Sequence, residues 1–338
     1  MRKLNVEKLE FDWPDPFSHK SSILSYPGIL VLTFLFLGCT QNLTLDQLLN
    51  EFEKEKKAMG TVSIFKDGKE IYNSSFGLKN IEKNEKADEN TKYWIGSISK
   101  PYTATIILQL IDEGKLSYTT LLKDFFPDIL NADKITIEQL LYHRSGLYNI
   151  TKSPNFEVWI AEPRDRNQMI SKIKEFNAEF LPDEKSSYSN TNFILLSYIA
   201  EILENKSFRE ILSERIFKKL NLKRTSFADT LNLANNEAMD YFPENGKWSP
   251  ITYQTNLSGT MGAGGVISTA KEVNIFFNNL FTGKLLSNKT LTKMTNPINE
   301  LGMGIGVSEF NGLLTYGHDG RIDGFRSIAV YAPELKLS

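Results

Sequence analysis

The sequence predicts an α+β fold in which an all-helical domain is inserted into a sheet domain. Strand patterns occur near both ends of the chain, whereas the middle is mostly helical. The pair Asp67-Gly68 lies between two β-prone runs, which is the signature of a hairpin. We therefore assign residues 39–115 and 256–338 to the sheet domain and residues 116–255 to the helical domain. The cleft between the two domains is the expected site.

Capping and turn signals define the individual elements. The stretch "TLDQLLNEFEKEKKAMG" predicts an amphipathic helix that begins at a Thr44–Gln47 capping box and ends at Gly60. A short strand, "TKYWIG", leads to a helix that ends at Gly114. Further on, "TNFILLSYIAEILEN" predicts an apolar helix and "GTMGAGGVIS" a glycine-rich loop. Strand patterns return in "MGIGVSEF", "LLTYGHDG" and "FRSIAVYAP".

Composition excludes several classes of function. The 338 residues carry a net charge of −2 without a long basic run, so we expect no nucleic-acid partner. A single cysteine, Cys39, rules out an intrachain disulfide. The three histidines, His19, His143 and His318, stand apart, and neither a CxxC nor an HExxH pattern occurs. We therefore expect no metal site and no other cofactor.

Residues 1–38 are interpreted as an export signal. Basic residues precede the apolar run "ILVLTFLFL", which is too short to span a bilayer comfortably. The following "FLFLGCTQ" resembles the lipobox of bacterial lipoproteins, which implies lipidation of Cys39 and a cell-envelope location facing the periplasm. Because no aspartate follows the cysteine, the outer membrane is favoured. A buried strand or an uncleaved anchor is the alternative interpretation of this run.

Ser97 and Lys100, in "SISKPYTATIILQLIDEGK", stand one helical turn apart. A serine hydroxyl is a poor nucleophile unless a base lies beside it, and residues i and i+3 share one face of a helix. Pro101 belongs in the first turn of a helix, because proline lacks an N–H group. Ser97 is therefore expected at the helix N-terminus, where unpaired N–H groups favour negative charge.

The same Ser-x-x-Lys spacing recurs at Ser63, Ser171 and Ser268, so the motif alone is not specific. Ser63 is expected in the middle of a strand, with its lysine on the opposite face. Ser171 lies in a highly charged segment and is expected on a solvated surface. Ser268 is expected to cap a helix.

Two patterns that occur once each accompany the Ser97 motif. They are Tyr188-x-Asn190 in "SSYSNTNF" and His318-x-Gly320 in "YGHDGRIDGFRS". Together with "ITIEQLLYHRSGL" and "GAGGVISTAKEV", they resemble the class C β-lactamase-like serine hydrolases. This group includes D-alanyl-D-alanine carboxypeptidases, class C β-lactamases, esterases and D-amino-acid peptidases. The resemblance covers about residues 60–338 and implies a β-lactamase/transpeptidase-like fold, an antiparallel sheet flanked by helices.

The resemblance also implies roles for the residues of the first two motifs. Ser97 would attack a carbonyl and form an acyl-enzyme, while Lys100 and Tyr188 would share the proton transfer. Which of the two is the general base stays open. Asn190 is expected to donate to Lys100 and to the substrate amide. Burial is expected to lower the pKa of the lysine towards a useful range.

The third motif is expected to bind the substrate. The resemblance places His318 on an edge strand, where a neutral imidazole attracts a carboxylate less than the lysine of relatives. The residue after Gly320 usually supplies an oxyanion N–H, and here that residue is Arg321. Its cation either blocks the site or replaces the carboxylate clamp. His143 is interpreted as a structural residue away from the three motifs.

The sequence therefore predicts an exported serine hydrolase that cleaves an amide or ester through an acyl-enzyme, of the D-alanyl-D-alanine carboxypeptidase, esterase or β-lactamase type. The expected partners are a small-molecule or peptide substrate, such as the peptidoglycan stem peptide, and a membrane through the lipid anchor. The alternative is a catalytically degenerate cell-wall-binding or sensor protein on the same fold. Relatives continue beyond "FRSIAVYAPELKLS" with a strand and a helix, so we predict that this sequence stops within that strand.

Overall fold

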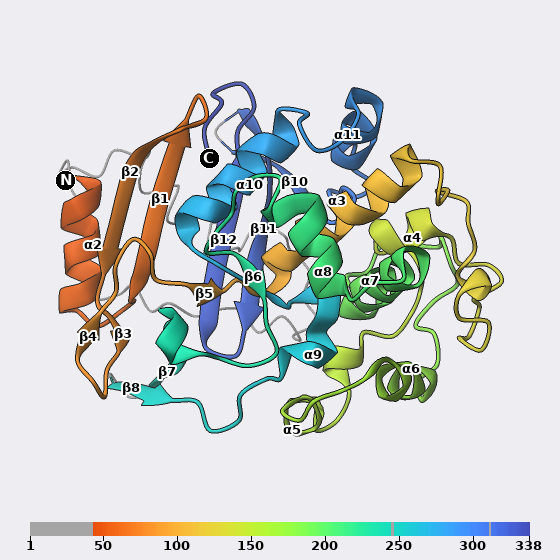
Figure 1. Ribbon diagram of the computed structural model, residues 1–338, viewed down its shortest axis with the longest axis horizontal. Coiled ribbons are helices and arrows are strands. Elements are labelled where there is room, and N and C mark those ends of the chain that lie inside the picture. The colour runs from red at the N-terminus through yellow and green to blue at the C-terminus, as the bar shows by residue number, and fades with distance from the viewer. Residues whose placement is uncertain (1–42, 245–246, 311) are drawn as a thin grey trace, which may run out of the picture. The chain divides into compact units, whose positions relative to one another are not determined.

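The computed structural model describes residues 43–244, 247–310 and 312–338 (Figure 1). The predicted export signal and Cys39 lie outside these residues. In the described part of the chain, no helix has both the length and the apolar character needed to cross a membrane. Among the described residues, 43–51 belong to one compact unit and those from 52 to 338 to another.

Helix α2 (Leu45–Lys54) begins at the predicted capping box. Thr44 N donates to Gln47 Oε1 at 2.8 Å, and Gln47 N donates to Thr44 Oγ1 at 3.3 Å. The helix ends before the predicted stop at Gly60, because Lys56 adopts a left-handed conformation with a φ of 52°. Gly60 instead begins the first strand.

Antiparallel strand pairs form the framework of residues 52–338. The first two strands make the hairpin predicted at Asp67-Gly68, whose residues have φ values of 51° and 73°. A three-stranded sheet has the order β10-β11-β12, a second one has the order β5-β9-β6, and β3-β4 and β7-β8 are hairpins. The strands are β1 (Gly60–Lys66), β2 (Lys69–Phe76), β3 (Leu78–Asn80), β4 (Glu85–Lys86), β5 (Tyr93–Trp94), β6 (Ser226–Phe227), β7 (Tyr241–Glu244), β8 (Lys247–Pro250), β9 (Val266–Ser268), β10 (Gly306–Phe310), β11 (Leu313–Ile322) and β12 (Phe325–Tyr331).

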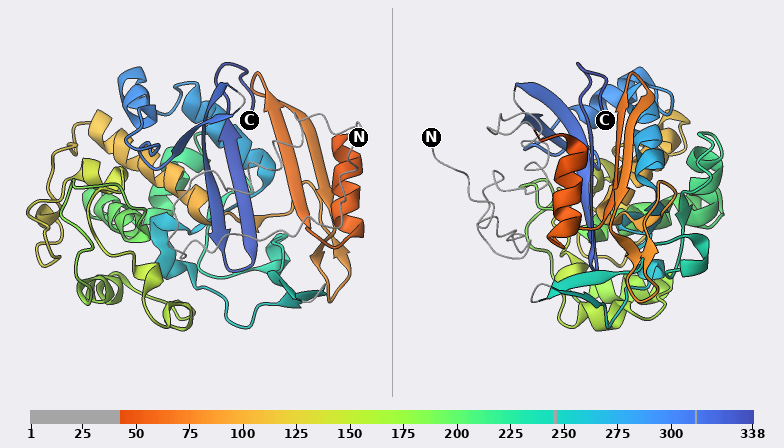
Figure 2. Two further views of the ribbon diagram at one scale, coloured as in Figure 1. Left: turned by 180° about the vertical axis from the view of Figure 1, so that it is seen from behind. Right: turned by 90° about the vertical axis from the view of Figure 1, so that its left-hand side faces the viewer.

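Helices cover the sheet and fill the middle of the chain. Figures 1 and 2 show α10 crossing one face of the strands, where it packs against β1 and β12. The helices after α2 are α3 (Ser99–Asp112), α4 (Ile137–Leu141), α5 (Phe156–Ile160), α6 (Arg166–Lys174), α7 (Asn190–Glu204), α8 (Phe208–Leu212), α9 (Leu257–Thr260), α10 (Ala270–Phe281) and α11 (Asn288–Thr295). The arrangement confirms the predicted α+β fold class.

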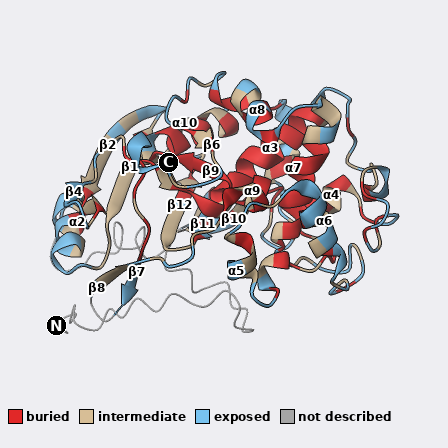
Figure 3. Cartoon of the chain, turned by 60° about the horizontal axis from the view of Figure 1, so that its bottom comes forward, coloured by how far each residue is buried: buried red, intermediate tan, exposed pale blue. Residues whose placement is uncertain are grey.

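Helices α3 and α7 pack against each other at the centre of the core. Every residue of α3 from Ser99 to Leu110 is buried, as is every residue of α7 from Thr191 to Ala200 (Figure 3). A helix that is buried all round must satisfy or neutralise each polar group that it carries. Pro101 lies in the first turn of α3, as predicted, and Gly114 follows the helix with a φ of 71°.

Two parts of the chain differ from or extend the sequence prediction. Residues 226–250, expected to be helical, contain β6, β7 and β8, and β6 pairs with β9. The Asn245-Gly246 pair is a hairpin signal in the sequence of this segment. Near the C-terminal end, Leu337 pairs with both Lys66 and Ala332. It therefore lies between β1 and the segment after β12, where the strand that follows β12 was predicted.

Candidate active site

Ser97 lies on a short 3-10 turn, Gly96–Ile98, that directly precedes α3. Its hydroxyl is therefore at the N-terminal end of the helix, as the position of Pro101 predicts. Lys100 follows in the first turn of α3 and is completely buried. The lysine Nζ lies 2.8 Å from Ser97 Oγ. The i, i+3 spacing thus places the amine directly on the hydroxyl.

A tyrosine from a distant segment completes this contact. Tyr188 Oη donates to Ser97 Oγ at 2.7 Å, although the two residues are far apart in sequence. The Nζ atom of Lys100 also lies 4.8 Å from the centre of the Tyr188 ring. The structure therefore brings an amine and a phenol to the oxygen atom of one serine hydroxyl. This arrangement suits nucleophilic catalysis by serine.

Lys100 has two further hydrogen-bond partners, and both are oxygen acceptors. Its Nζ donates to Asn190 Oδ1 at 2.8 Å and to the Ala263 carbonyl oxygen at 2.9 Å. Asn190 was predicted to donate to Lys100, and this is wrong, because its amide oxygen faces the amine. Burial lowers the pKa of Lys100 well below its ordinary value, an effect that the Asp319 carboxylate partly opposes.

The segment that carries Tyr188 leads into α7 and is held by side chains of a neighbouring loop. Asn190 is the first residue of the helix, and its backbone N–H donates to Asn149 Oδ1 at 3.1 Å. Its side-chain Nδ2 donates to Thr151 Oγ1 at 3.1 Å. These bonds fix the orientation of the Asn190 amide and leave its oxygen to Lys100. The sequence prediction missed Asn149 and Thr151, because only the fold brings their loop to α7.

His143 does not lie away from the motifs, contrary to the sequence prediction. Its ring centre is 4.6 Å from that of Tyr188, and its Nδ1 accepts the Ser189 N–H at 3.1 Å. The segment after α4 turns back onto the start of α7, so a residue far from the motifs in sequence reaches the site in space. Burial lowers the pKa of His143 well below 6.5, so the ring is neutral at pH 7.

The opposite side of the site is the second half of β11. This strand is the middle one of its sheet, but from His318 onwards its residues pair with β12 alone. The predicted edge position of His318 therefore holds only for this part of the strand. The centre of the His318 ring lies 6.1 Å from that of Tyr188, and burial lowers the pKa of the imidazole below 6.5.

Two glycines let β11 approach the nucleophile. A Cβ on Gly320 would lie 2.0 Å from the Ile95 carbonyl oxygen, and a Cβ on Gly96 would lie 2.9 Å from Arg321 N. Gly96 also has a φ of 50°, which other residues rarely adopt. The Arg321 backbone thus passes directly beside the turn that carries Ser97, whereas the Arg321 side chain is exposed.

The other Ser-x-x-Lys motifs occupy different environments. Ser63 lies in β1, as predicted, and its hydroxyl donates to Glu70 at 2.9 Å. Ser171 is exposed on α6. Ser268 lies in β9, and the predicted cap of the next helix is instead Thr269, whose Oγ1 accepts the Glu272 N–H at 3.2 Å. The prediction for Ser268 was one residue too early, because β9 continues up to the helix.

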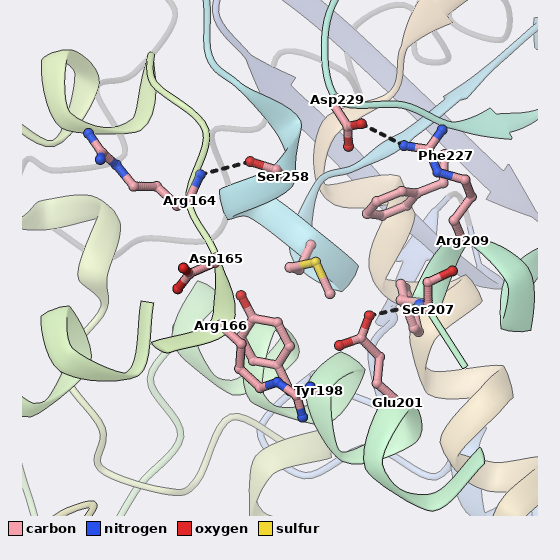
Figure 4. Close-up of a pocket in the computed structure, with 12 residues that line it drawn as sticks. Arg164, Asp165, Arg166, Tyr198, Glu201, Ser207, Arg209, Phe227, Asp229 and Ser258 are labelled. Carbon is pink, nitrogen blue, oxygen red and sulfur yellow. Dashed lines mark hydrogen bonds and ion pairs between the residues drawn. The ribbon is translucent and has the colours of Figure 1, made fainter. Parts of the chain in front are cut away.

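A separate cavity of about 350 Å³ does not include Ser97, Lys100 or Tyr188. Figure 4 shows it between segments that carry both acidic and basic side chains. The charges at its rim are largely used within the protein, since Arg209 pairs with Asp229 at 2.8 Å. The lining includes Arg166, Tyr198, Glu201, Ser207, Ser258 and Met261. In the described ranges, no group of three or more His, Cys, Asp or Glu side chains could hold a metal ion.

Comparison with known proteins gives consistent relatives. The protein PbpX of Bacillus subtilis (strain 168) is 26% identical over 282 residues, which are 83% of this chain and 69% of PbpX. Teichoic acid D-alanine hydrolase of Staphylococcus aureus is 25% identical over 239 residues, 71% of this chain and 57% of the relative. The crystal structure of D-amino acid amidase from Ochrobactrum anthropi SV3 has the same fold, with a TM-score of 0.76 and 22% identity, covering 87% of this chain and 90% of the amidase.

A family model covers the part of the chain that contains the site. The model of the family named Beta-lactamase matches residues 45–338, which is most of the chain and includes all three motifs. The serine, lysine and tyrosine that the sequence singles out meet at one oxygen atom in the structure. The chain therefore belongs to the β-lactamase-like family of serine hydrolases.

Proposed function

We propose that the protein hydrolyses an amide or ester of a D-amino acid through an acyl-enzyme on Ser97. The observation that carries the proposal is the meeting of Lys100 Nζ and Tyr188 Oη at Ser97 Oγ, at 2.8 and 2.7 Å. A serine held between a base and a proton donor is activated for attack on a carbonyl carbon.

The surroundings of Lys100 favour the lysine as the base in the first step. A neutral amine has two N–H groups and one lone pair. The two N–H groups are used by Asn190 Oδ1 and the Ala263 carbonyl oxygen, so the lone pair is left for the Ser97 hydroxyl. The lowered pKa of Lys100 supports this neutral form at pH 7.

The reaction then follows from the positions of these groups. Ser97 Oγ forms a bond to the substrate carbonyl carbon while its proton passes to Lys100. The bond from that carbon to the leaving nitrogen or oxygen breaks, and the leaving group departs with the phenol proton of Tyr188. The proton held by Lys100 restores the phenol. Water then attacks the acyl-enzyme, and the same groups return a free serine and a carboxylic acid.

The backbone is suited to stabilise the negative charge that develops on the carbonyl oxygen. Ser97 stands at a helix N-terminus, and the Arg321 backbone passes beside Gly96. We place the oxyanion between the N–H groups of Ser97 and Arg321. A neutral His318 supplies no fixed cation for a substrate carboxylate, so esters and amides without one are expected to be accepted. The names of the amidase and the D-alanine hydrolase support D-amino acids as the acyl group. The D-alanine terminus of a peptidoglycan stem peptide has the same chemistry.

Covalent labelling tests the proposal directly. The purified protein is incubated with a fluorophosphonate or a penicillin, and its intact mass is measured. The wild-type chain should gain one adduct, and Ser97→Ala should gain none. Ser171→Ala is the matched control, because this exposed serine has the same spacing to a lysine. Hydrolysis of D-alanine p-nitroanilide should exceed that of the L enantiomer by at least about tenfold.

The alternative, a binding or sensor protein on the same fold, predicts a different result. In that case a folded wild-type sample forms no adduct with either probe. If Ser97 is labelled but the two enantiomers are hydrolysed at equal rates, the proposed acyl-enzyme is supported and the proposed preference for D-amino acids is rejected.

We also propose that the protein is exported and anchored in the cell envelope through a lipid on Cys39. Support comes from the sequence alone, an apolar run followed by the lipobox-like "FLFLGCTQ". In cell fractionation, Cys39→Ser should move the protein from the membrane fraction to the soluble fraction. Unchanged retention would argue for an uncleaved anchor.

A further inference from the structure

His143 holds the chain on both sides of Tyr188. Its backbone carbonyl oxygen accepts the N–H of Ser187 at 2.8 Å, and its ring Nδ1 accepts the N–H of Ser189 at 3.1 Å. One residue therefore accepts the N–H groups of the residues immediately before and after the tyrosine. The His143 ring also packs against the tyrosine ring, with 4.6 Å between their centres.

A chain of hydrogen bonds defines the state of the His143 ring. Ser145 Oγ accepts the Leu147 N–H at 3.1 Å and donates to Asn192 Oδ1 at 2.6 Å. The amide oxygen of Asn192 is thereby occupied, so its Nδ2 is the atom that faces His143 Nδ1, at 3.3 Å. Because both neighbours of Nδ1 are donors, this nitrogen is an acceptor and the ring proton is on Nε2.

The hydrogen bonds of His143 are shielded from water, because the residue is buried. The residue is 2% exposed, and its backbone has a φ of 56°. The charged or titratable groups that act on its ring are Lys100 and His318, both of which disfavour the imidazolium. Burial has the same effect and is the largest cause of its lowered pKa, so the acceptor at Nδ1 is available at pH 7.

We propose that His143 is the positioning residue that sets the phenol of Tyr188 on Ser97. Only the effect of His143 on kcat rests on the proposed acyl-enzyme function; its effect on the position of Tyr188 does not. The bond from Tyr188 Oη to Ser97 Oγ is 2.7 Å long, and the tyrosine itself is 36% exposed. The bonds that His143 accepts from the N–H groups of Ser187 and Ser189, together with the His143 ring packed against the tyrosine ring, hold the phenol in this position.

Three variants of His143 separate the acceptor from the ring. His143→Asn keeps an acceptor near the Nδ1 position and tolerates a positive φ, but it lacks the aromatic face. His143→Phe keeps the aromatic face and leaves the Ser189 N–H without its acceptor. His143→Ala removes both. Tyr142→Phe is the matched control, because Tyr142 is an equally buried neighbour whose hydroxyl donates to Lys293 and Asn296 carbonyl oxygens instead.

The first measurement is the rate constant kcat and the KM for an ester or amide substrate. His143→Ala and His143→Phe should lower kcat by about 10²-fold and change KM by less than about threefold, because the bound substrate is not touched. The kcat of His143→Asn should be at least about tenfold higher than that of His143→Ala or His143→Phe. Tyr142→Phe should lower the melting temperature without lowering kcat. If the Ala and Phe variants lower kcat no more than Tyr142→Phe does, His143 is only structural and the proposal is overturned.

The second measurement needs no activity. Amide hydrogen exchange is followed on a peptide that covers residues 185–192. His143→Phe should speed exchange in this peptide by about tenfold or more, and His143→Asn should restore slow exchange. Unchanged exchange in a folded His143→Phe sample overturns the proposal even if the wild-type protein is inactive. Faster exchange in a protein that forms no acyl-enzyme would uphold the positioning role and reject the proposed function.

Discussion

The two walls of the active site are held in different ways. The helical wall consists of Ser97, Lys100, Tyr188 and Asn190, whose side chains are joined by hydrogen bonds of 2.7–2.8 Å. The strand wall consists of residues 318–321 of β11. It approaches the helical wall through its backbone, and its side chains at Asp319 and Arg321 are exposed.

This difference separates two tasks. In the helical wall each polar group has a hydrogen-bond partner within the wall, and Lys100 is completely buried, so the fold determines the positions of these groups. In the strand wall the backbone is fixed by close contact, whereas the exposed side chains can change without disturbing the core. The helical wall is therefore expected to activate the nucleophile, and the exposed side chains of the strand wall are expected to determine which substrate is accepted.

The largest effect is expected from removing the amine of the helical wall. Lys100→Met should lower kcat/KM by about 10²–10⁴-fold, because Ser97 loses its proposed base. The free energy of unfolding should stay within about 1 kcal/mol of wild type, since the hydrogen bonds that are lost are offset by relief of a desolvated amine. Steady-state kinetics and urea unfolding measure the two quantities.

Lys174→Met, in the exposed motif that begins at Ser171, is the matched control and should keep wild-type activity. The pH profile sharpens the test. Because the base must be neutral, wild-type kcat/KM should rise as the pH passes the lowered pKa of Lys100, well below its ordinary 10.5. Wild-type rates in Lys100→Met would remove this residue from the mechanism.

The next largest effect is expected in the backbone of the strand wall. Gly320→Ala places a Cβ within 2.0 Å of the Ile95 carbonyl oxygen, so β11 must move away from the turn that carries Ser97. If the Arg321 N–H binds the oxyanion, kcat/KM should fall by about 10²–10³-fold. Gly60→Ala is the matched control, since a Cβ there meets nothing within 4 Å. Equal kinetics for the two variants would show that the contact at Gly320 does not matter for the reaction.

The sequence predicted those parts of the site that depend on local rules. The spacing of Ser97 and Lys100 places them on one face of a helix, and Pro101 determines where that helix begins. The Asp67-Gly68 hairpin follows in the same way from the conformational preferences of two residues. Family resemblance added Tyr188, because no local rule connects it to Ser97.

Other features depend on contacts that no short segment contains. His143 was placed away from the site, because its loop reaches Tyr188 only when α4 and α7 pack together. Asn190 presents its side-chain oxygen to Lys100, because Asn149 Oδ1 lies beside the backbone N–H and the side-chain Nδ2 of Asn190. Strand β6 has only two residues and exists because β9 is available to pair with it. Such features follow from tertiary packing.

A smaller effect, on selectivity rather than on rate, is expected from a side chain of the strand wall. His318→Lys puts a cation where the structure has a neutral imidazole. The ratio of kcat/KM for carboxylate-bearing over neutral substrates should rise by roughly tenfold, the contribution of one charged hydrogen bond. A matched pair of esters, with and without a carboxylate, gives this ratio.

Arg321 provides the counterpart to this change. If its exposed guanidinium attracts the substrate carboxylate, Arg321→Gln should lower the same ratio and leave neutral esters unaffected. Faster turnover of both esters would instead show that the arginine obstructs the site. An unchanged ratio in both variants would contradict the assignment of selectivity to the strand wall.

The smallest effect concerns how the strand wall is anchored. The turn between β11 and β12 is held by Asp240, whose Oδ1 accepts the Gly324 N–H at 2.9 Å. Burial, together with the Asp323 carboxylate, raises the pKa of Asp240 from 3.8 to about 7. The folded protein therefore holds a proton that the unfolded chain releases above pH 3.8, so this contribution to stability declines as the pH rises towards 7.

Asp240→Asn keeps the amide oxygen for Gly324 and removes the titration. Its melting temperature relative to wild type should therefore increase between pH 4 and about pH 8, by roughly 5 °C, and then stay level. Asp128→Asn is the control for the substitution itself, because that side chain is 78% exposed. A difference between Asp240→Asn and wild type that does not change with pH would mean that Asp240 is ionised throughout. The turn of the strand wall would then be anchored by a charge, and the contrast with the neutral helical wall would be sharper still.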